Sequence, residues 1–306
     1  MAVDILMATY NGGKYLRNQL LSLQQQTYED WTLWIRDDGS TDDTLFILSK
    51  FAESDERIRI VEEQAGNQLG PGKNFLGLTR YSKGDYSIFC DQDDIWFEKK
   101  LEVLVDFADE NFDVDIPSLV YCDGYGYSNT KGVIISDGIS PYHPKSLDEF
   151  LFLNSGYQGC SMLFNRRLCI MAANYRADYY MHDDIVALLG HSFGHVYFVP
   201  KKLMLWRQHE SNVTGNVSID LLPSLKRVLN KKLYVLSARH YKEKEAFYNA
   251  YENDLDNSAK RLFIAYLAFP NKSYFSRILL ILRNGFSLGG SKSKLLFKAF
   301  IRRPIE

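Results

Sequence analysis

The sequence predicts an α/β protein with a doubly wound, mostly parallel sheet, followed by a C-terminal helical extension. In the first hundred residues, short apolar runs rich in β-branched residues alternate with segments of helical spacing. Such alternation is typical of a parallel sheet that carries helices on both faces. Polar turn residues follow several of these runs, and from about residue 216 onward the pattern is helical throughout.

The expected strands and helices of the first part follow one another in regular order. The runs expected to form strands are residues 3–9, 31–40, 57–63 and 85–91. The segments with helical spacing are residues 15–23, 42–52, 74–81 and 99–110. Within the second of these helices, Leu45, Leu48 and Phe51 recur every three residues, so we expect them to share one face.

The next part of the chain is less regular and is expected to complete the sheet. Its strand-like segments are residues 118–125, 159–166 and 195–209. A helix is expected to follow the acidic segment that ends at Asp184. We therefore expect an α/β domain at residues 1–215 and a basic, apolar helical region at residues 216–306.

Length and composition narrow the class of protein. The 306 residues fit one large α/β domain with an appendage, and 46% hydrophobic with 24% charged residues is ordinary for a soluble protein. No basic and apolar leader opens the chain, and no apolar run reaches the ~18 residues needed to span a bilayer. The four cysteines have no metal-ligand spacing, which suits reduced thiols and a cytoplasmic location.

The net charge of −2 hides an asymmetry between the two ends of the chain. Residues 258–306 contain ten Lys or Arg and one acid, a net charge of +9, whereas the remaining residues carry −11. Apolar clusters at 262–269, 278–282 and 295–301 lie among these bases. Such a region can lie on an anionic membrane, and the alternative is a packing surface for the catalytic domain or for a homodimer.

The densest group of acids follows the buried run that ends at Cys90. Asp91, Asp93 and Asp94 occupy three of four successive positions. Carboxylates this close repel one another unless a cation joins them, and hard oxygen ligands select Mg²⁺ or Mn²⁺. The alternative is a solvated acidic turn. Two other polar segments, 9–11 and 37–38, also follow strands, and in a doubly wound sheet such strand ends form the ligand crevice.

Seven segments resemble, in order and spacing, the family 2 glycosyltransferases with the GT-A fold, a Rossmann-like α/β fold. They are residues 8–16, 26–44, 67–75, 84–96, 159–166, 182–184 and 207–215. The combination is most similar to bacterial rhamnosyltransferases of cell-wall and capsule polysaccharide synthesis. The resemblance spans about residues 3–215 and therefore implies a nucleotide-sugar-dependent transferase.

This resemblance implies a role for each strand end. Thr9, Tyr10 and Asn11 would lie along the nucleoside, and Asp38 would accept a hydrogen bond from the pyrimidine N3–H. Asp37 is expected to form the turn instead. Lys73 would approach the nucleotide, although an exposed lysine at a helix start is the competing interpretation.

The acidic segment would hold the diphosphate end of the donor. The resemblance makes Asp93 the ligand of an Mn²⁺ or Mg²⁺ cofactor, with His209 as a further ligand. Asp91 would contact the ribose or a metal-bound water, and Arg207 would support the phosphate charge. Asp94 is expected to be structural.

The segment His182-Asp183-Asp184 would supply the general base. One aspartate is expected to cap the following helix, and the other to take the proton of an acceptor hydroxyl. The rhamnosyltransferase pattern puts Asp183 in that role. Because a second acid follows and the tryptophan of that pattern is missing, Asp184 stays the alternative. Residues 159–165 would line the acceptor side or form a core strand.

The implied reaction is inverting, metal-dependent transfer of a sugar from a nucleoside diphosphate to a hydroxyl. The best candidate donor is dTDP-β-L-rhamnose, and the acceptor would be a lipid-linked saccharide at the inner face of the membrane. Within the same fold, the alternative is transfer from a UDP-hexose. Two other classes are a non-catalytic binding module and a sugar-phosphate nucleotidyltransferase, although the latter needs an arginine that the segment after the first strand lacks. We expect no nucleic-acid partner.

Overall fold

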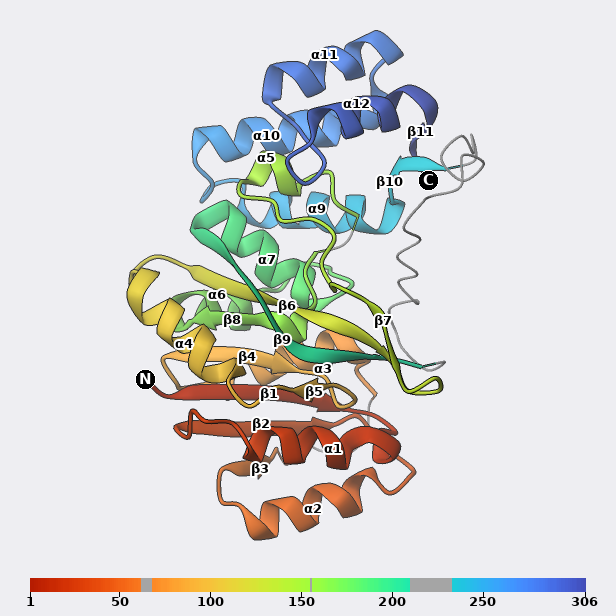
Figure 1. Ribbon diagram of the computed structural model, residues 1–306. Coiled ribbons are helices and arrows are strands. Elements are labelled where there is room, and N and C mark those ends of the chain that lie inside the picture. Colours follow the sequence, from red (N-terminus) through yellow and green to blue (C-terminus); the bar gives the residue numbers. More distant parts are fainter. Residues whose placement is uncertain (62–67, 155, 210–232) are drawn as a thin grey trace.

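The computed structural model describes residues 1–61, 68–154, 156–209 and 233–306 (Figure 1). A nine-stranded sheet forms the centre, in the order β3-β2-β1-β4-β8-β6-β9-β5, with β7 paired to β6. Helices cover the sheet, and the C-terminal helices stack at one pole of the molecule (Figure 1). The expected α/β class with a C-terminal helical extension is confirmed.

The first half of the sheet is parallel. Its strands are β1 (Val3–Thr9), β2 (Trp31–Asp37), β3 (Ile58–Ile60) and β4 (Tyr86–Cys90), and they pair with one another in parallel. The helices between and after them are α1 (Gly13–Gln24), α2 (Thr44–Ser54), α3 (Pro71–Leu78) and α4 (Lys100–Asn111). Each corresponds to an element expected from the sequence.

The second half of the sheet mixes both directions. Its strands are β5 (Ile95–Trp96), β6 (Ser118–Ser128), β7 (Val133–Ser136), β8 (Met162–Asn165) and β9 (His195–Gln208). Strand β8 runs antiparallel to β4. Its beginning, with the short 3₁₀ helix η1 (Gly159–Ser161), therefore lies at the carboxyl end of β4, beside the acidic segment.

The sheet separates two hydrophobic cores. Val3, Ile5 and Met7 of β1 pack in one core with α1, α2 and α4, whereas Leu6 and Ala8 face the other. That second core includes α3 and three further helices, α5 (Leu147–Phe150), α6 (Arg166–Asn174) and α7 (His182–Phe193). Alternation along β1 thus separates the two cores, as expected for a sheet covered on both faces.

One helix face differs from the expectation. Leu45 is 49% exposed, and the buried residues of α2 are Thr44, Ile47, Leu48 and Phe51. The helical repeat of 3.6 residues accounts for this difference, because a strict three-residue spacing drifts around the helix. Leu48 and Phe51 face the core as predicted.

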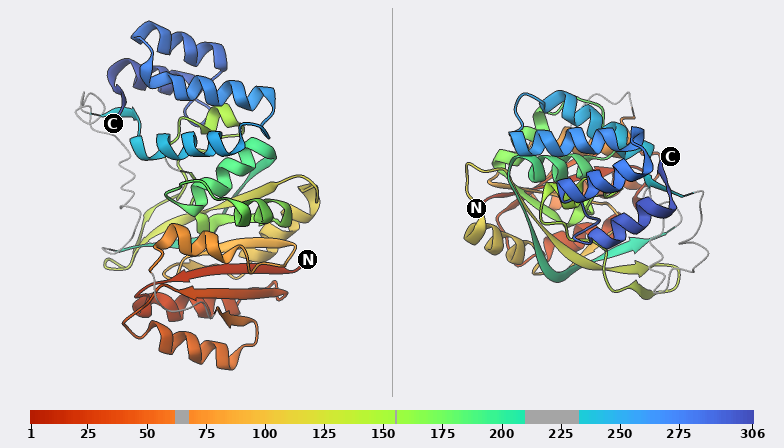
Figure 2. Two further views of the ribbon diagram at one scale, coloured as in Figure 1. Left: turned by 180° about the vertical axis from the view of Figure 1, so that it is seen from behind. Right: turned by 90° about the horizontal axis from the view of Figure 1, so that it is seen from above.

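The C-terminal region shares the core of the α/β domain. Its helices are α9 (Ala238–Tyr251), α10 (Asn257–Ala268), α11 (Tyr274–Asn284) and α12 (Lys292–Ile301), with the 3₁₀ helix η2 (Phe269–Asn271). Phe247, Phe263 and Tyr266 pack in the same core as α7. Seen from behind, α9 lies next to α7, and α11 and α12 lie farthest from the sheet (Figure 2).

Two short strands correct the expectation of a purely helical C-terminal region. Strands β10 (Tyr234–Leu236) and β11 (Arg303–Ile305) form a parallel pair. The proposed boundary at residues 215 and 216 lies outside the described residues. No helix among the described residues is long and apolar enough to cross a membrane. All four cysteines are buried and free.

Candidate active site

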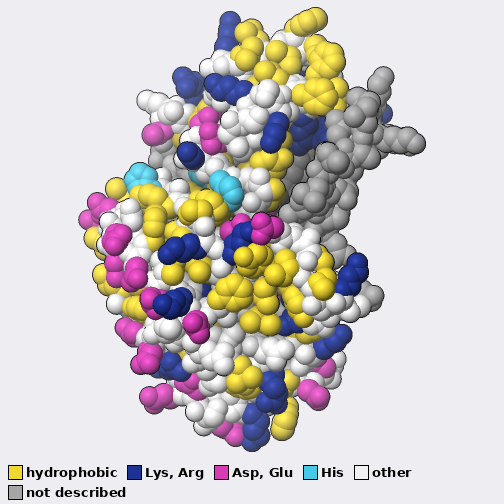
Figure 3. Space-filling view, in the orientation of Figure 1, with side chains coloured by type: hydrophobic (Ala, Val, Ile, Leu, Met, Phe, Trp, Pro, Cys, Tyr) yellow, Lys and Arg dark blue, Asp and Glu magenta, His cyan; other side chains and the backbone are white. Residues whose placement is uncertain are grey.

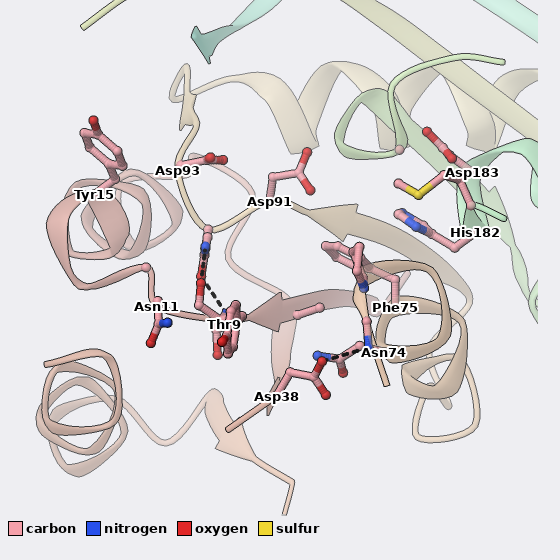
Figure 4. Close-up of a pocket in the computed structure, with 18 of the residues that line it drawn as sticks. Thr9, Asn11, Tyr15, Asp38, Asn74, Phe75, Asp91, Asp93, His182 and Asp183 are labelled. Carbon is pink, nitrogen blue, oxygen red and sulfur yellow. Dashed lines mark hydrogen bonds between the residues drawn. The ribbon is translucent and has the colours of Figure 1, made fainter. Parts of the chain in front are cut away.

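A cleft of about 950 Å³ opens where β1, β2 and β4 end and α7 begins (Figure 4). It receives side chains from segments that are far apart in the sequence. Among the residues that line it are Thr9, Tyr10, Asn11, Tyr15, Asp38, Asn74, Phe75, Asp91, Gln92, Asp93, Gln158, Gly159, His182, Asp183, Trp206 and His209. The expected crevice at the carboxyl ends of the parallel strands is therefore present.

The end of β1 forms one wall of the cleft. The backbone N–H of Tyr10 donates to Gln92 Oε1 and its carbonyl accepts from Gln92 Nε2, both at 3.0 Å. Asn11 has a positive φ of 47°, and its side-chain oxygen accepts from the backbone N–H of Thr41 at 2.8 Å. These bonds hold the turn after β1 open toward the cleft.

The two aspartates after β2 differ in their surroundings. Asp37 accepts from the backbone N–H groups of Gly39 and Ser40 and from the Thr9 hydroxyl, so its expected turn role is confirmed. Asp38 lines the cleft, where Arg36 Nη1 lies 2.9 Å from its Oδ1. Its two oxygens also accept from the N–H groups of residues 69 and 70, each at 2.9 Å. Asp38 therefore fixes the start of α3 against β2.

Two residues expected at the nucleotide do not line the cleft. Lys73 is exposed, and its neighbour Asn74 is the residue that faces the cleft from α3. Arg207 is buried, and its Nε donates to the carbonyl of Asp93 at 2.6 Å. Arg207 therefore supports the acidic loop from behind.

The acidic loop concentrates negative charge beside β4. Burial and the charge on Asp93 raise the pKa of Asp91 to about 7. Burial and the charges on Asp91 and Asp93 raise the pKa of Asp94 well above its usual range. Lys100 is buried beneath the loop, where its Nζ donates to the carbonyl of Cys160 at 2.6 Å. The buried Lys100 ammonium group therefore lies beneath a loop that carries three carboxylates.

Asp94 has the structural role expected for it. It is fully buried, and its Oδ1 accepts from the backbone N–H of Arg207 at 3.1 Å. This bond joins the acidic loop to the end of β9. Among the described residues, its Oδ2 has no hydrogen-bond partner.

His209 completes the acidic side of the cleft. Its Nε2 lies 2.7 Å from Asp93 Oδ2, and its ring packs against Tyr15 with centroids 4.7 Å apart. Figure 4 shows Asp93 between Tyr15 and Asp91 at one side of the cleft. Asp93 and His209 are far apart in the sequence. They meet because β5, which follows Asp93, pairs with β9, which ends just before His209.

The donor groups on this side of the cleft suit a hard divalent cation by their chemistry. Asp93 and His209 offer a carboxylate oxygen and an imidazole nitrogen 2.7 Å apart, and Asp91 offers a further carboxylate in the same cleft. A cation bound here would offset the negative charge of Asp93, which together with burial raises the pKa of Asp91. Cys160 lies within 4.8 Å of Asp91 and Asp94, but burial and the two carboxylates raise the pKa of its thiol, which disfavours a thiolate ligand.

The two aspartates of α7 face different ways. Asp183 lines the cleft, whereas Asp184 Oδ1 accepts from the backbone N–H of Gly156 at 2.6 Å. Asp184 Oδ2 lies 3.2 Å from Nδ1 of His240, which comes from α9. Neither is a side-chain cap, because α7 begins at His182 and its N-cap position is Met181. Both acids instead lie in the first turn, where the helix dipole favours them.

Burial and pairing set the basicity of these two acids. Burial and the charge on Asp184 raise the pKa of Asp183 well above its usual range. Burial would also raise the pKa of Asp184, but the hydrogen bond and charge of His240 and the charge on Lys244 hold it below its usual value. Asp183 is therefore the more basic carboxylate, and it is the one that faces the cleft.

His182 was not singled out as a functional residue by the sequence analysis. Its ring is 3% exposed and stacks on Phe75 with centroids 4.2 Å apart. Among the described residues, neither ring nitrogen has a hydrogen-bond partner. Burial lowers the pKa of His182 to about 3, so the ring is neutral at pH 7. It offers one donor and one acceptor beside Asp183.

Other lining residues also escaped the sequence analysis. Gln92 stands inside the acidic segment, and Tyr15 on an amphipathic helix resembles an ordinary core position. Gly159 lines the cleft, while residues 162–165 form the buried strand β8. The core-strand interpretation therefore applies to residues 162–165, and the acceptor-side role of the part that lines the cleft stays a prediction.

The parallel half-sheet, its cleft and the carboxylates at both sides define a glycosyltransferase with the GT-A fold. The sequence model of glycosyl transferase family 2 matches residues 4–170, more than half of the chain, and the chain belongs to this family. It is 29% identical to the dTDP-rhamnosyl transferase RfbG of Shigella flexneri over 227 residues. That alignment covers 69% of this chain and 75% of RfbG.

Solved structures share the fold at low sequence identity. The structure of residues 1–349 of S. aureus TarS with UDP-GlcNAc superposes with a TM-score of 0.59 at 18% identity, covering 93% of this chain and 80% of that chain. The mannosyltransferase PcManGT from Pyrobaculum calidifontis, in complex with GDP-Man and Mn²⁺, gives 0.50 at 15% identity, covering 98% and 86%.

Proposed function

We propose that this enzyme is an inverting, metal-dependent glycosyltransferase that moves L-rhamnose from dTDP-β-L-rhamnose to a hydroxyl of a lipid-linked saccharide in bacterial surface polysaccharide synthesis. One observation carries the proposal. Asp93 and Asp183 lie at opposite sides of one cleft, with Asp91 between them (Figure 4). This arrangement suits a donor whose diphosphate lies at Asp93 and whose sugar points toward Asp183.

The nucleotide would occupy the side of the cleft near the end of β1. Thr9, Tyr10 and Asn11 lie there, and Asp38 closes that side. A free lone pair on the Asp38 carboxylate would accept from the imide N–H of thymine or uracil. Because cytosine has no proton at N3, the same contact would reject it.

Asp93 and His209 would hold Mn²⁺ or Mg²⁺, with Asp91 beside them. When bound, the cation would supply positive charge for the diphosphate as it leaves. Arg207 holds the carbonyl of Asp93 in place at 2.6 Å, so it would position this ligand from behind. The structure of PcManGT with Mn²⁺ supports this cofactor class.

Asp183 would act as the general base. The acceptor oxygen forms a bond to the anomeric carbon while the bond from that carbon to the diphosphate oxygen breaks, and the hydroxyl proton passes to Asp183. Attack opposite the leaving group inverts the configuration, so a β-linked donor gives an α-L-rhamnosyl product. The raised pKa of Asp183 strengthens it as a base for this step.

His182 would bind a hydroxyl of the reacting sugars. Its nitrogens are buried beside Asp183 without a partner among the described residues, and a buried polar group costs stability unless it is hydrogen-bonded. A sugar hydroxyl can both donate and accept, so it can satisfy a neutral imidazole. The aromatic stack with Phe75 would keep the ring in place.

RfbG supports rhamnose as the transferred sugar, because its alignment covers most of both chains. A UDP-hexose is the second candidate donor, and the TarS structure with UDP-GlcNAc supports it. Either donor would use the same carboxylates. The difference lies in the contacts to the base and the sugar ring.

Thermal-shift screening separates the donors. With Mn²⁺ present, dTDP-rhamnose is expected to raise the melting temperature more than UDP-glucose, UDP-galactose or UDP-GlcNAc. Acceptor-dependent release of the nucleoside diphosphate then tests transfer, with Asp183→Asn as the matched control that binds donor without turnover. A larger shift with a UDP-sugar would overturn the rhamnose assignment. Donor binding without acceptor-dependent release in the parent enzyme would overturn the catalytic one.

A further inference from the structure

Helices α11 and α12 present apolar side chains to solvent at the pole farthest from the sheet. Phe275, Leu279 and Leu282 follow one another at four- and three-residue intervals along α11, and Ile281 on its other side is fully buried. Phe275 is 83% exposed and Phe300 of α12 is 67% exposed. Phe297 of α12 is 51% exposed. We use the name α11–α12 face for the five exposed residues Phe275, Leu279, Leu282, Phe297 and Phe300.

The two helices form one continuous surface. The Tyr274 ring contacts both Phe275 and Phe300, with centroids 5.3 and 5.8 Å apart. In Figure 3 the apolar side chains gather at the top of the molecule, where Figure 1 places α11 and α12. Contiguous exposed aromatic and aliphatic groups of this kind mark an interaction surface.

Bases surround this apolar face, and the only nearby acids that the described residues place against its two helices are Asp148 and Glu149 of α5, which lie beside Gly285 and Gly290 in the connection between α11 and α12. Residues 258–305 contain no Asp or Glu. The exposed bases in this part of the chain include Lys272, Arg283, Lys292, Lys294 and Arg303. Among the described residues, none of these five forms an ion pair. Their charges are therefore available to a negatively charged partner.

Other bases of the same region have structural roles, which sharpens the contrast. Lys298 donates to the carbonyl of Val235 at 3.0 Å, and burial lowers its pKa to about 8. Arg277 donates to the carbonyls of Phe269 and Pro270. The region thus separates inward-facing bases that hold the fold from outward-facing bases that do not.

We propose that the α11–α12 face lies in the headgroup region of an anionic lipid bilayer. Large apolar side chains with a basic rim suit this position, because the rings enter the interface while Lys and Arg meet lipid phosphates. Pairing of the same face in a symmetric dimer would bring like charges together. The inference does not depend on the identity of the donor sugar.

Co-sedimentation with vesicles tests the proposal on the full chain. The parent is expected to bind vesicles with about one third phosphatidylglycerol far better than pure phosphatidylcholine vesicles, and to lose binding as salt rises. The double variant Phe275→Ser/Phe300→Ser should reduce binding by roughly tenfold or more, because it removes two exposed apolar side chains. The triple variant Lys272→Gln/Arg283→Gln/Lys292→Gln should abolish the preference for anionic vesicles.

Phe46→Ser provides a matched control. Phe46 is 62% exposed on α2, at the opposite pole of the molecule, so this variant should bind like the parent. Unchanged melting temperatures would show that all variants fold. Binding to neither vesicle type, or equal binding to both, would overturn the proposal. A parent dimer in sedimentation velocity that Phe275→Ser/Phe300→Ser dissociates would also overturn it, in favour of self-association.

Discussion

Replacing Asp183 or Asp184 of α7 by asparagine is expected to affect two different properties, sugar transfer and stability. Asp184 holds two partners: the backbone N–H of Gly156 at 2.6 Å and His240 Nδ1 at 3.2 Å. Asp183 faces the cleft, where burial disfavours its charge. We expect Asp184→Asn to lower stability and Asp183→Asn to abolish sugar transfer without lowering stability.

The magnitude follows from the contacts that change. An asparagine at 184 keeps one oxygen for Gly156 but places a neutral amide against His240. Losing one charge-assisted hydrogen bond costs about 1.5–3 kcal/mol. For a chain of this size each kcal/mol lowers the melting temperature by about 2 °C, so we expect a decrease of roughly 3–6 °C. Asp183→Asn removes a buried charge and its repulsion from Asp184, so its melting temperature should equal or exceed that of the parent.

Differential scanning fluorimetry from pH 5 to pH 8 tests the direction in which the stability of each variant changes with pH. The raised pKa of Asp183 means that the folded state resists its ionisation, so this residue costs stability as the pH rises above the ordinary carboxyl value. The advantage of Asp183→Asn over the parent should therefore grow with pH. Asp184 has a lowered pKa, so its contribution should stay constant across this scan and be lost only at a lower pH, below the ordinary carboxyl value.

Acceptor-dependent release of nucleoside diphosphate, with donor affinity from thermal shifts, completes this experiment. Asp183→Asn should keep donor affinity within a few-fold, because the proposed contact of this residue is with the acceptor hydroxyl. An inactive but stable Asp184→Asn, together with an active Asp183→Asn, would refute the reasoning and make Asp184 the base.

Four further substitutions test the site and the packing of α3. Asp93→Asn should remove nearly all transfer with an unchanged melting temperature, and EDTA should do the same to the parent; full turnover in a chelated assay would contradict the metal role. His182→Phe should keep or raise stability, because no buried ring nitrogen remains, while lowering kcat/KM at least roughly tenfold; undiminished turnover would mean that His182 binds no sugar. Gly72→Ala should destabilise the protein, because its Cβ would lie 2.5 Å from the carbonyl oxygen of Tyr180, whereas at Gly77 nothing lies within 4 Å. Gly77→Ala is therefore the matched control, expected to stabilise α3 by up to about 1 kcal/mol, and equal melting temperatures for the two variants would contradict the packing of α3 on this loop.

The sequence was sufficient for elements whose signal is local. Strands such as β1 are continuous apolar runs, and the acidic segment follows one of them directly. Strands β10 and β11 have three residues each and pair across about seventy residues, so no local pattern indicates them. Lys73 and Asn74 also show that a local pattern is not sufficient. Neighbouring side chains on a helix point about 100° apart, so a shift of one residue decides which of them faces the cleft.

Side chains at the site were harder to predict when their role depends on distant partners. Nothing near Gln92 in the sequence indicates that its amide holds both backbone groups of Tyr10. Arg207 looked like a phosphate ligand from its motif, yet its contact with the Asp93 carbonyl depends on how β5 and β9 pair. The sequence pattern therefore indicates which segments lie near the cleft more reliably than it indicates which way their side chains point.

The C-terminal helices contact the candidate active site and also form the proposed membrane face. His240 of α9 lies against Asp184, the neighbour of the proposed base, and Lys244 on the same helix donates to the carbonyl of Leu153 at 2.7 Å. Phe263 and Tyr266 of α10 then bury α9 from the other side. Because these contacts link Asp184 to the helical region, deleting that region would disturb the base and the membrane face together. Point substitutions on the outward surface of α11 and α12 separate the two, since Phe275 and Phe300 are exposed and the core-facing side of α11 is left unchanged.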